Sequence, residues 1–522
     1  MNKLLQSMKR AGDARRFNQR TRTTKGAGAH ASIRTGDSNA EAVLPFFTNA
    51  GAMRGRTDEV WQLFQEALTG HELMAIRALF YLRNPRHNGA GERQLFRDTF
   101  IQFAERNDRV AAKVAGLIPE FGRWDDLLTL AYHQGAMYRY PLTWKAITGK
   151  VRIQLQLDSF AVDEGVPTSL LPKWMPSINS KSAKTRGRAH FWRKQLGLNN
   201  EQYRKLLSKT RAPINLVENL MSRNLWHLIN YATVPAKAHL RLRDKFMEHD
   251  AARYSAYLAT QAQESGGIKV AGLAAHEIIR QYSGSRQLDK TLEAQWNALI
   301  EEFGTNSLKV LPVFDNSASM GRWTGRVRAS GRPGAPREVA IALAAFFSQV
   351  NDSAFRDWVM SFENDAKMHH LNGKCLLDRM WELRRQTSDH GTTNVASVYR
   401  TLLKFARNNS VPAEDMPEVL LLVSDMQFDM VGYGYRTALE DMRIQYANAG
   451  YEMPVVVFWN VNAHTSSSPV KADDRGTIMV SGLSQQIMKT MLQMDIEQLR
   501  SFTPLGAMWN TLNSDPYNKI VY

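Results

Sequence analysis

An aspartate and two serines follow a run of apolar residues in the second half of the chain. The run 310–314 leads directly to Asp315, and Ser317 and Ser319 come at alternate positions after it. A strand that ends on a carboxylate, followed by two hydroxyls on a tight loop, can direct three oxygens at one point. Hard oxygen ligands of this kind suit a hard divalent cation such as Mg²⁺. The segment therefore predicts part of a magnesium site.

Two later segments supply further oxygens. Thr393, with Thr392 beside it as the alternative, lies at a loop-to-helix junction, and Asp425 directly follows a second apolar run. The order and spacing of the three segments resemble the von Willebrand factor A (vWA) family and its metal-ion-dependent adhesion site. That resemblance implies that Mg²⁺, or another divalent cation, is bound by the residues at the matching positions, which are Asp315, Ser317, Ser319, Thr393 and Asp425.

The surrounding sequence predicts a fold that suits such a site. Continuous apolar runs, typical of strands covered on both faces, lie at 308–314, 358–362, 417–424 and 454–459. Helical patterns lie between them, at 337–350, 374–385, 395–408 and 437–449. This alternation predicts a mainly parallel sheet in a doubly wound, Rossmann-like α/β domain. Ligands in such sheets bind beyond the carboxyl ends of the strands, where all three metal-site segments begin.

A metal at these carboxylates could also serve phosphodiester hydrolysis. No His or Glu at a recognisable spacing accompanies them, and His369–His370 is typical of a surface pair rather than a ligand pair. We therefore expect a protein that is not an enzyme, in which a carboxylate from an acidic protein partner fills the open coordination position. The Gly/Arg/Pro-rich segment 321–336 would overhang the metal, as a partner contact or as a flexible insertion.

Composition limits the class of protein. The chain has 522 residues, of which 43% are hydrophobic, enough for two or three globular domains. Its only cysteine is Cys375, so no intrachain disulfide can form, which fits a cytoplasmic location. No apolar run approaches the ~20 residues that span a bilayer, and 1–16 lacks the apolar core of a secretion signal. We expect no membrane partner.

The net charge of +17 is concentrated in two segments. Residues 1–40 hold nine Lys and Arg against two acids, and residues 173–211 hold eleven against one, so together they carry the whole excess. A charge run is often only a solvated face. Two runs that carry the entire excess favour a polyanion partner, because Lys and Arg release counterions when they contact phosphates.

Aromatic residues are interleaved with the cations of the second segment. Exposed rings beside cations suit phosphate contacts and base stacking on single-stranded RNA. The competing interpretation places Phe191 and Trp192 in the core, and we expect it to hold for one of the two rings. The candidate RNA-binding residues are Lys181, Lys184, Arg186, Arg188, Trp192, Arg193 and Lys194.

The N-terminal half is predicted to be helical. Residues 1–40 lack a periodic apolar pattern and predict a basic flexible arm. From 41 to 287, apolar residues recur at i, i+3 and i+4, which predicts a HEAT-like α-solenoid, open or closed into a ring. Residues 288–522 follow as the vWA domain.

Short motifs extend the resemblance across about 40–522. The turn 88–93 (Asn-Gly-Ala-Gly-Glu-Arg), the segment 121–128 and the segment 234–238 resemble TROVE-like proteins, which join a helical half to a vWA domain. Asn84 and Asn88 depart from that group's pattern. Its better studied relatives, the Ro autoantigens, bind small noncoding RNAs and the ends of misfolded RNAs. The resemblance implies a ribonucleoprotein component with RNA as its partner; self-association stays open.

Several of these motifs also have structural interpretations. Glu92 would repel a phosphate at the start of the next helix, so the Gly-rich turn favours a helix–helix connection. Asp125 suits an N-cap, Trp124 a core anchor, and His276–Glu277 packing rather than chemistry. Two functional alternatives stay open beside RNA binding: an assembly component, for example of a phage, whose basic regions serve packing or solubility, and a metal-dependent nuclease.

Overall fold

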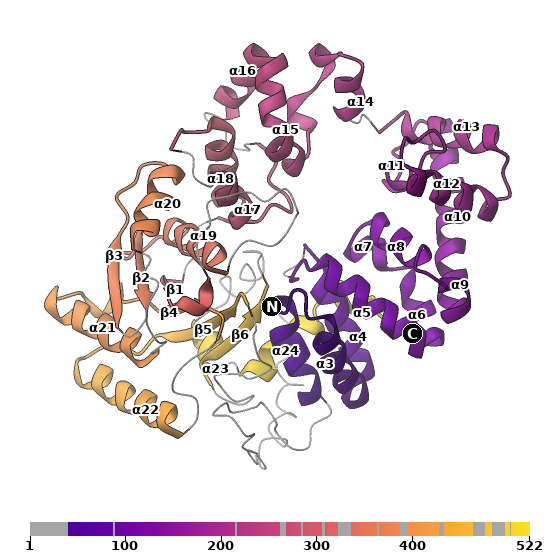
Figure 1. Ribbon diagram of the computed structural model, residues 1–522. Helices are drawn as coiled ribbons and strands as arrows, with labels where there is room; N and C mark the ends of the chain where they lie inside the picture. The colour runs from indigo at the N-terminus through magenta and orange to yellow at the C-terminus, as the bar shows by residue number, and fades with distance from the viewer. Residues whose placement is uncertain are drawn as a thin grey trace. The chain divides into compact units, whose positions relative to one another are not determined.

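Helices precede a six-stranded sheet in this computed structural model (Figure 1). The residues that the structure describes are 40–86, 89–214, 217–261, 268–282, 286–304, 308–321, 336–362, 365–386, 395–426, 433–462, 475–482, 496–501 and 503–522. No helix in this described part is both long enough and apolar enough to cross a membrane.

The chain divides into two compact units. The first takes its described residues from 1–92 and 232–518, and the second from 93–231 and 519–522. The predicted helical region 41–287 is thus shared between them. Its middle part forms the second unit, whereas the helices before and after that part belong with the sheet, because they bury their apolar faces against it or against its helices.

The sheet of the first unit has the strand order β3-β2-β1-β4-β5-β6, and only the edge strand β3 is antiparallel to its neighbour. The strands are β1 Val310–Asp315, β2 Trp358–Phe362, β3 Ala366–His370, β4 Val419–Ser424, β5 Val455–Asn460 and β6 Thr477–Ser481. The predicted α/β domain with a mainly parallel sheet is confirmed. β2 and β3 are added on one side of β1, whereas β4, β5 and β6 are added on the other. The carboxyl ends of the parallel strands β1 and β4 therefore lie side by side at the point where the strand order reverses, which is where ligands bind in such folds.

Helices cover both faces of the sheet. Alternate residues of β1, such as Leu311 and Val313, join one core with α21 (Val395–Asn408) and α22 (Tyr433–Asn448). The opposite face packs against α19 (Pro336–Gln349), where Phe347 contacts Trp459 of β5. β1, β4 and β5 are buried along their whole length because of this double cover, which explains their unbroken apolar sequence.

The remaining helices of the first unit surround this centre. They are α2 Leu44–Asn49, α3 Thr57–Gly70, α4 Glu72–Arg83, α15 Ala236–His249, α16 Ala251–Gln261, α17 Ala275–Ile279, α18 Lys290–Phe303, α20 Leu376–Arg385, α23 Ile496–Ser501, α24 Pro504–Leu512 and α25 Asp515–Asn518. Neighbours in sequence pack in pairs, α3 with α4 and α15 with α16. α17 packs on α19 and so links the helices to the sheet.

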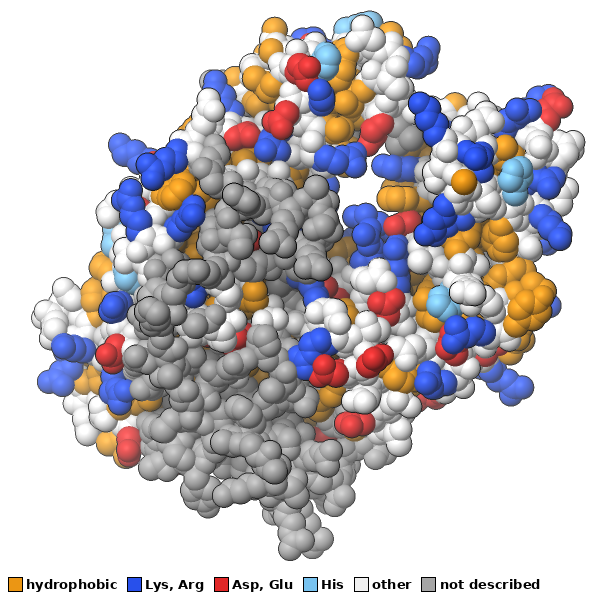
Figure 2. Space-filling view, viewed as in Figure 1, with side chains coloured by type: hydrophobic (Ala, Val, Ile, Leu, Met, Phe, Trp, Pro, Cys, Tyr) orange, Lys and Arg blue, Asp and Glu red, His pale blue; other side chains and the backbone are white. Residues whose placement is uncertain are grey.

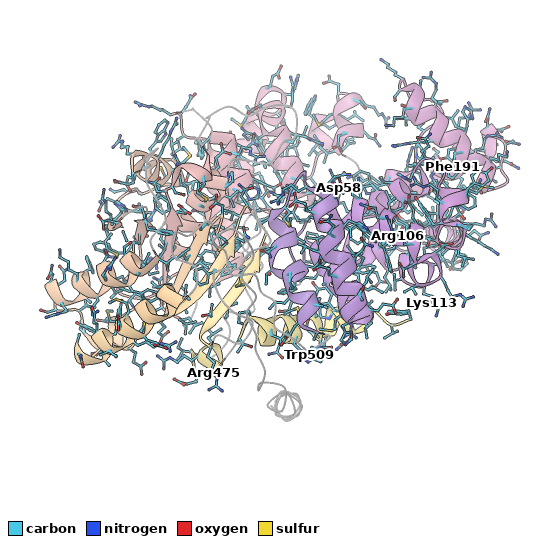
Figure 3. All side chains as sticks on the ribbon, turned by 60° about the horizontal axis from the view of Figure 1, so that its bottom comes forward. Asp58, Arg106, Lys113, Phe191, Arg475 and Trp509 are labelled. Atoms are coloured by element: carbon cyan, nitrogen blue, oxygen red, sulfur yellow. The ribbon has the colours of Figure 1, made fainter. Side chains whose placement is uncertain are left out.

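The first helices of this unit pack against its last elements. α2 contacts β6 and α24, and α4 contacts α24 and α25. Arg77 of α4 donates to Asn513 Oδ1 at 2.6 Å, and Asn84 Nδ2 donates to the Tyr517 hydroxyl at 3.3 Å. Trp509 of α24, labelled in Figure 3, lies edge-on to the ring of His71. The first and last helices of this unit are thus packed against one another.

The Gly-rich turn after α4 uses its backbone amides to cap that helix. The amides of Ala90, Gly91 and Glu92 donate to carbonyls of Tyr81, Asn84 and Leu82 respectively. The Glu92 carboxylate accepts from Arg54 Nε at 2.8 Å. These amides are already paired and the side chain beside them is acidic, which supports the structural interpretation of the turn over phosphate binding.

Replacing Gly89 with Ala should destabilise the first unit by about 3 kcal/mol. A Cβ there would lie 2.6 Å from Asn84 Cβ and 2.7 Å from the Tyr81 carbonyl oxygen, and would also strike the Asn84 carbonyl, which is backbone. Gly187→Ala is the matched control, because its Cβ would meet nothing within 4 Å and Ala favours a helix. Thermal unfolding of the two variants measures the difference, and equal melting temperatures would contradict the expectation.

The second unit contains helices and loops but no strand in its described residues. Its helices are α5 Arg93–Arg106, α6 Asp108–Ala115, α7 Ile118–Phe121, α8 Trp124–Ala131, α9 Ala136–Arg139, α10 Pro141–Asp163, α11 Leu171–Trp174, α12 Ala183–Gln195, α13 Asn200–Arg211 and α14 Val217–Ser222. α10 buries one face against α6, α8 and α13. The start of α8 corrects the sequence-based interpretation: Arg123, not Asp125, is the N-cap residue, and Trp124 is only half-buried.

Candidate metal site and nucleic-acid interface

The carboxyl ends of β1 and β4 bring two aspartates together. Asp315 is fully buried at the end of β1, and Asp425 is 2% exposed just after β4. Ser424 Oγ donates to Asp315 Oδ2 at 2.6 Å, and the Ser317 amide donates to Asp315 Oδ1 at 2.8 Å. Burial, and then the negative charge of Asp425, raises the pKa of Asp315 to about 6, against the effect of these hydrogen bonds.

The two serines of the first motif lie side by side in the loop that follows. Their hydroxyl oxygens, Ser317 Oγ and Ser319 Oγ, are 2.9 Å apart. The structure thus places four of the five predicted ligands at one end of the sheet. Thr393 and the segment 322–335, which we expected to overhang the metal, lie outside the described residues. A carboxylate pair with adjacent hydroxyls is a hard-oxygen donor set, so these residues fit a divalent cation.

Two residues that sequence analysis did not identify hold this loop in place. Arg337, at the start of α19 and 2% exposed, donates from Nη2 to the carbonyls of Asn316 and Ser317 at 3.3 and 2.9 Å. Asn316 Nδ2 donates to the carbonyl of Gln386 at the end of α20. No local pattern signalled either role, because both contacts join residues that are distant in sequence.

The described residues offer hydroxyls beside the two carboxylates, but no larger cluster of charged or imidazole ligands. Within the described residues there is no group of three or more His, Cys, Asp or Glu side chains that could hold a metal. His369 Nε2 lies 2.7 Å from the Ser361 hydroxyl, and His370 lies edge-on to Trp358, so the pair occupies opposite sides of β3 and does not converge on a ligand. This agrees with the surface-pair interpretation.

His276–Glu277 takes part in packing. The Glu277 carboxylate accepts from the Ala274 amide at 3.0 Å and pairs with Lys237 at 2.7 Å, which secures the start of α17. Burial lowers the pKa of His276 to about 4, so its ring is neutral at physiological pH. The expectation that these two residues serve packing is thereby supported.

The basic segment of the second unit forms α11, α12 and α13. Lys181, Lys184 and Lys194 are exposed, while Arg188 places its guanidinium 4.5 Å from the centre of the Tyr132 ring. Arg186 Nη1 donates to the carbonyls of Ser180 and Lys181, and Arg193 Nη1 donates to that of Leu198. Figure 2 shows Lys and Arg side chains gathered over these helices.

Trp192 corrects the predicted RNA-binding set. Its ring is fully buried, and its Nε1 donates to the Tyr132 hydroxyl. It therefore offers no face on which a base can stack. Phe191, labelled in Figure 3, is half-buried among Tyr132, Trp144 and Trp192. As expected for one ring of the two, Trp192 belongs to the core; it joins α12 to α8, so the candidate contacts that remain are cations.

In comparisons with known proteins, the chain is similar in sequence to domains and proteins whose function is not defined. Two family models match adjoining segments, each described as a domain of unknown function: DUF2828 over residues 166–307 and DUF7788 over residues 309–505. "Uncharacterized protein L728" of Acanthamoeba polyphaga mimivirus is 26% identical over 516 residues, which cover 92% of this chain and 86% of that protein.

Among solved structures, the crystal structure of Deinococcus radiodurans RO (RSR) protein is similar. The match covers 87% of this chain and 99% of that one, with a TM-score of 0.40 and 15% sequence identity. A score below 0.5 does not by itself establish a common fold, and fold alone does not establish function. The chemistry of the sites must therefore come from this chain's own residues.

Proposed function

We propose that the protein binds RNA without acting on it as an enzyme, through the basic surface of α11–α13, and that its sheet is a vWA-type domain holding a divalent cation. The observation that carries the first part is the unbalanced charge of one unit. Residues 93–231 and 519–522 contain 23 Lys and Arg against 11 Asp and Glu. A surplus of this size on one compact unit favours a polyanion partner.

The surplus is not neutralised within the unit. Of the eleven cations in 173–211, Lys205 pairs with Glu201 at 2.8 Å and Lys209 with Asp163 at 2.6 Å. The other nine make no ion pair with a carboxylate in the described part of the chain. Arg186, His190 and Lys194, four residues apart in turn, share one face of α12. Such a face suits a phosphate backbone, which requires no base-specific pocket.

Replacing Lys181, Lys184 and Lys194 with Gln should weaken binding to a single-stranded RNA and flatten its salt dependence. Three lost phosphate contacts lower the slope of log affinity against log salt by about 2, at ~0.7 per contact. All three side chains are exposed, so the fold should not change. Fluorescence anisotropy of a labelled oligonucleotide across a salt series measures the slope.

A second triple variant separates local contacts from overall charge. Lys290, Lys367 and Lys404 are exposed on the first unit, and their change to Gln removes the same formal charge. The proposal expects this variant to keep the wild-type slope. If both triple variants lower the slope equally, or if the wild-type chain binds no RNA, the assignment of α11–α13 as the RNA surface is wrong.

The residues at the end of the sheet would hold the cation from two sides. Asp315, Ser317 and Ser319 approach from β1, and Asp425 from β4; Thr393 or Thr392 is the further ligand that the vWA resemblance implies. When bound, the cation would supply a positive centre for an oxygen from outside. Since the donors include two carboxylates and neutral hydroxyls, a carboxylate of an acidic protein partner is the best outside ligand.

A further inference from the structure

The long helix α10 presents an apolar stripe to solvent. Ile153, Leu157 and Phe160 are 57%, 55% and 62% exposed, although large apolar side chains at helical spacing are usually buried. The opposite side of the same helix is fully buried through Ile147 and Val151. Apolar side chains gather in Figure 2 where Figure 1 places α9 and α10. α10 is therefore apolar on two sides, of which its own unit covers one.

Further exposed apolar side chains lie near both ends of α10 and extend the stripe. Leu142 lies at the start of α10, with Met137 and Tyr138 just before it, and Val166 and Leu170 follow its end. Tyr138 is 82% exposed. Eight large apolar side chains exposed between 137 and 170 are more than the scattered apolar residues that monomeric proteins normally expose.

Charges of opposite sign flank the central part of the stripe, which is formed by Ile153, Leu157 and Phe160. Lys150, Ile153, Leu157, Phe160 and Glu164 follow one another at spacings of three and four, so they share one side of the helix. A cation thus stands before the apolar centre and a carboxylate after it. Neither Lys150 nor Glu164 makes an ion pair in the part of the chain that the structure describes.

We propose that this stripe is the contact surface for a second copy of the chain, with the two α10 helices antiparallel. A pair centred on Leu157 places Lys150 of each copy beside Glu164 of the other. The same helix therefore supplies the cation for one ion pair and the carboxylate for the second. The segment from Lys150 to Glu164 is about 21 Å long at ~1.5 Å per residue. Two-fold contacts of this isologous kind are the commonest in homo-oligomers.

Light scattering coupled to size-exclusion chromatography of the full chain tests the proposal. The wild-type mass should approach twice the 59.2 kDa of one chain as concentration rises. Leu157→Glu should hold the mass at one chain. Leu228→Glu is the matched control, because Leu228 is 56% exposed in the same unit but lies outside the stripe, and it should keep the wild-type mass.

Charge reversal tests the antiparallel arrangement. Lys150→Glu and Glu164→Lys should each weaken the dimer about tenfold or more, because each places like charges opposite one another in both symmetry-related pairs. The chain that carries both changes should recover the wild-type association. A wild-type chain that stays at one-chain mass at every concentration overturns the proposal, as does a double variant no better than the singles. Loss of RNA binding in Leu157→Glu without any change in mass would assign the stripe to RNA instead.

Discussion

Mg²⁺ raises the melting temperature of the full chain, and Asp315→Asn abolishes that increment: this is the expected result if the residues at the end of β1 hold a cation. A ligand that binds only the folded state stabilises it by about 2.7 kcal/mol at one hundred times its Kd. Asp315 is fully buried beside Asp425, and both the burial and the repulsion raise its pKa. A bound cation would offset the free-energy cost of holding two negative charges there. Differential scanning calorimetry with Mg²⁺ and with EDTA measures the increment.

The increment, not the absolute melting temperature, is the quantity to compare. Removing a buried charge can itself stabilise a fold, so Asp315→Asn without metal has no fixed expected sign. Asp352→Asn serves as the control, because Asp352 is an exposed carboxylate of the same unit. The measurement needs the full chain. A fragment that holds only the predicted vWA domain would lack α2 and α4, which pack against β6, α24 and α25. An equal Mg²⁺ increment in wild type and Asp315→Asn would contradict the metal assignment.

Arg97→Met should destabilise the second unit by about 3–5 kcal/mol, the usual cost of removing one partner of a buried ion pair. Arg97 Nε donates to Asp126 Oδ1 at 2.7 Å, and Nη2 donates to Asp125 Oδ2 at 2.8 Å. Asp126 is 0% exposed and also accepts from the Arg123 amide at the start of α8. The variant would leave that carboxylate buried beside an apolar side chain.

Hydrogen exchange in a urea series should show which helices lose stability in Arg97→Met. Amides of α5 and α8 should lose protection at lower urea than in wild type, whereas amides of β1 and β4 in the other unit should change little. Arg93→Met is the control: Arg93 is half exposed and lies 3.8 Å from Asp125, so its loss should cost less than about 1 kcal/mol. An Arg97→Met chain as stable as the Arg93→Met chain would show that the buried pair contributes little.

The sheet could be predicted because its strands are covered on both faces. β1, β4 and β5 appear in the sequence as unbroken apolar runs, and their observed bounds differ from the predicted ones by at most two residues at either end. β6 was missed: Thr477–Ser481 begins and ends on hydroxyl side chains, although the structure buries it entirely. Burial imposed by α2 and α24 on that edge is a tertiary effect, which no local pattern reveals.

α10 was not predicted from the sequence because it is apolar on two sides. Helix prediction relied on one apolar side and one polar side, but α10 carries buried apolar residues such as Val151 on one side and exposed ones such as Leu157 on another. A Gly at position 149 further weakens the signal. The prediction for α12 was wrong at one ring, because spacing alone could not show that Trp192 turns toward Tyr132.

The loop that follows β1 shows the same limit. Asp315 and Ser317 were predicted from a strand-end motif, and Asp425 from the resemblance to the vWA family; the topology of a parallel sheet brings the two strand ends together. Arg337 and Asn316, which hold the loop, were not, because a buried guanidinium bound to two carbonyls has no signature in the sequence. Thr393 stays a prediction, as it lies outside the described residues.

The packing of α2 and α4 against β6, α24 and α25 constrains how the protein is made. These helices leave the ribosome early, but the surfaces that bury them are encoded roughly 400 residues later, which is about 20–80 s of synthesis at ~5–20 residues per second. During that interval Phe46, Phe47 and Leu79, all buried in the finished fold, lack those partners. These side chains therefore reach their final packing only after the last helices of the chain have been made.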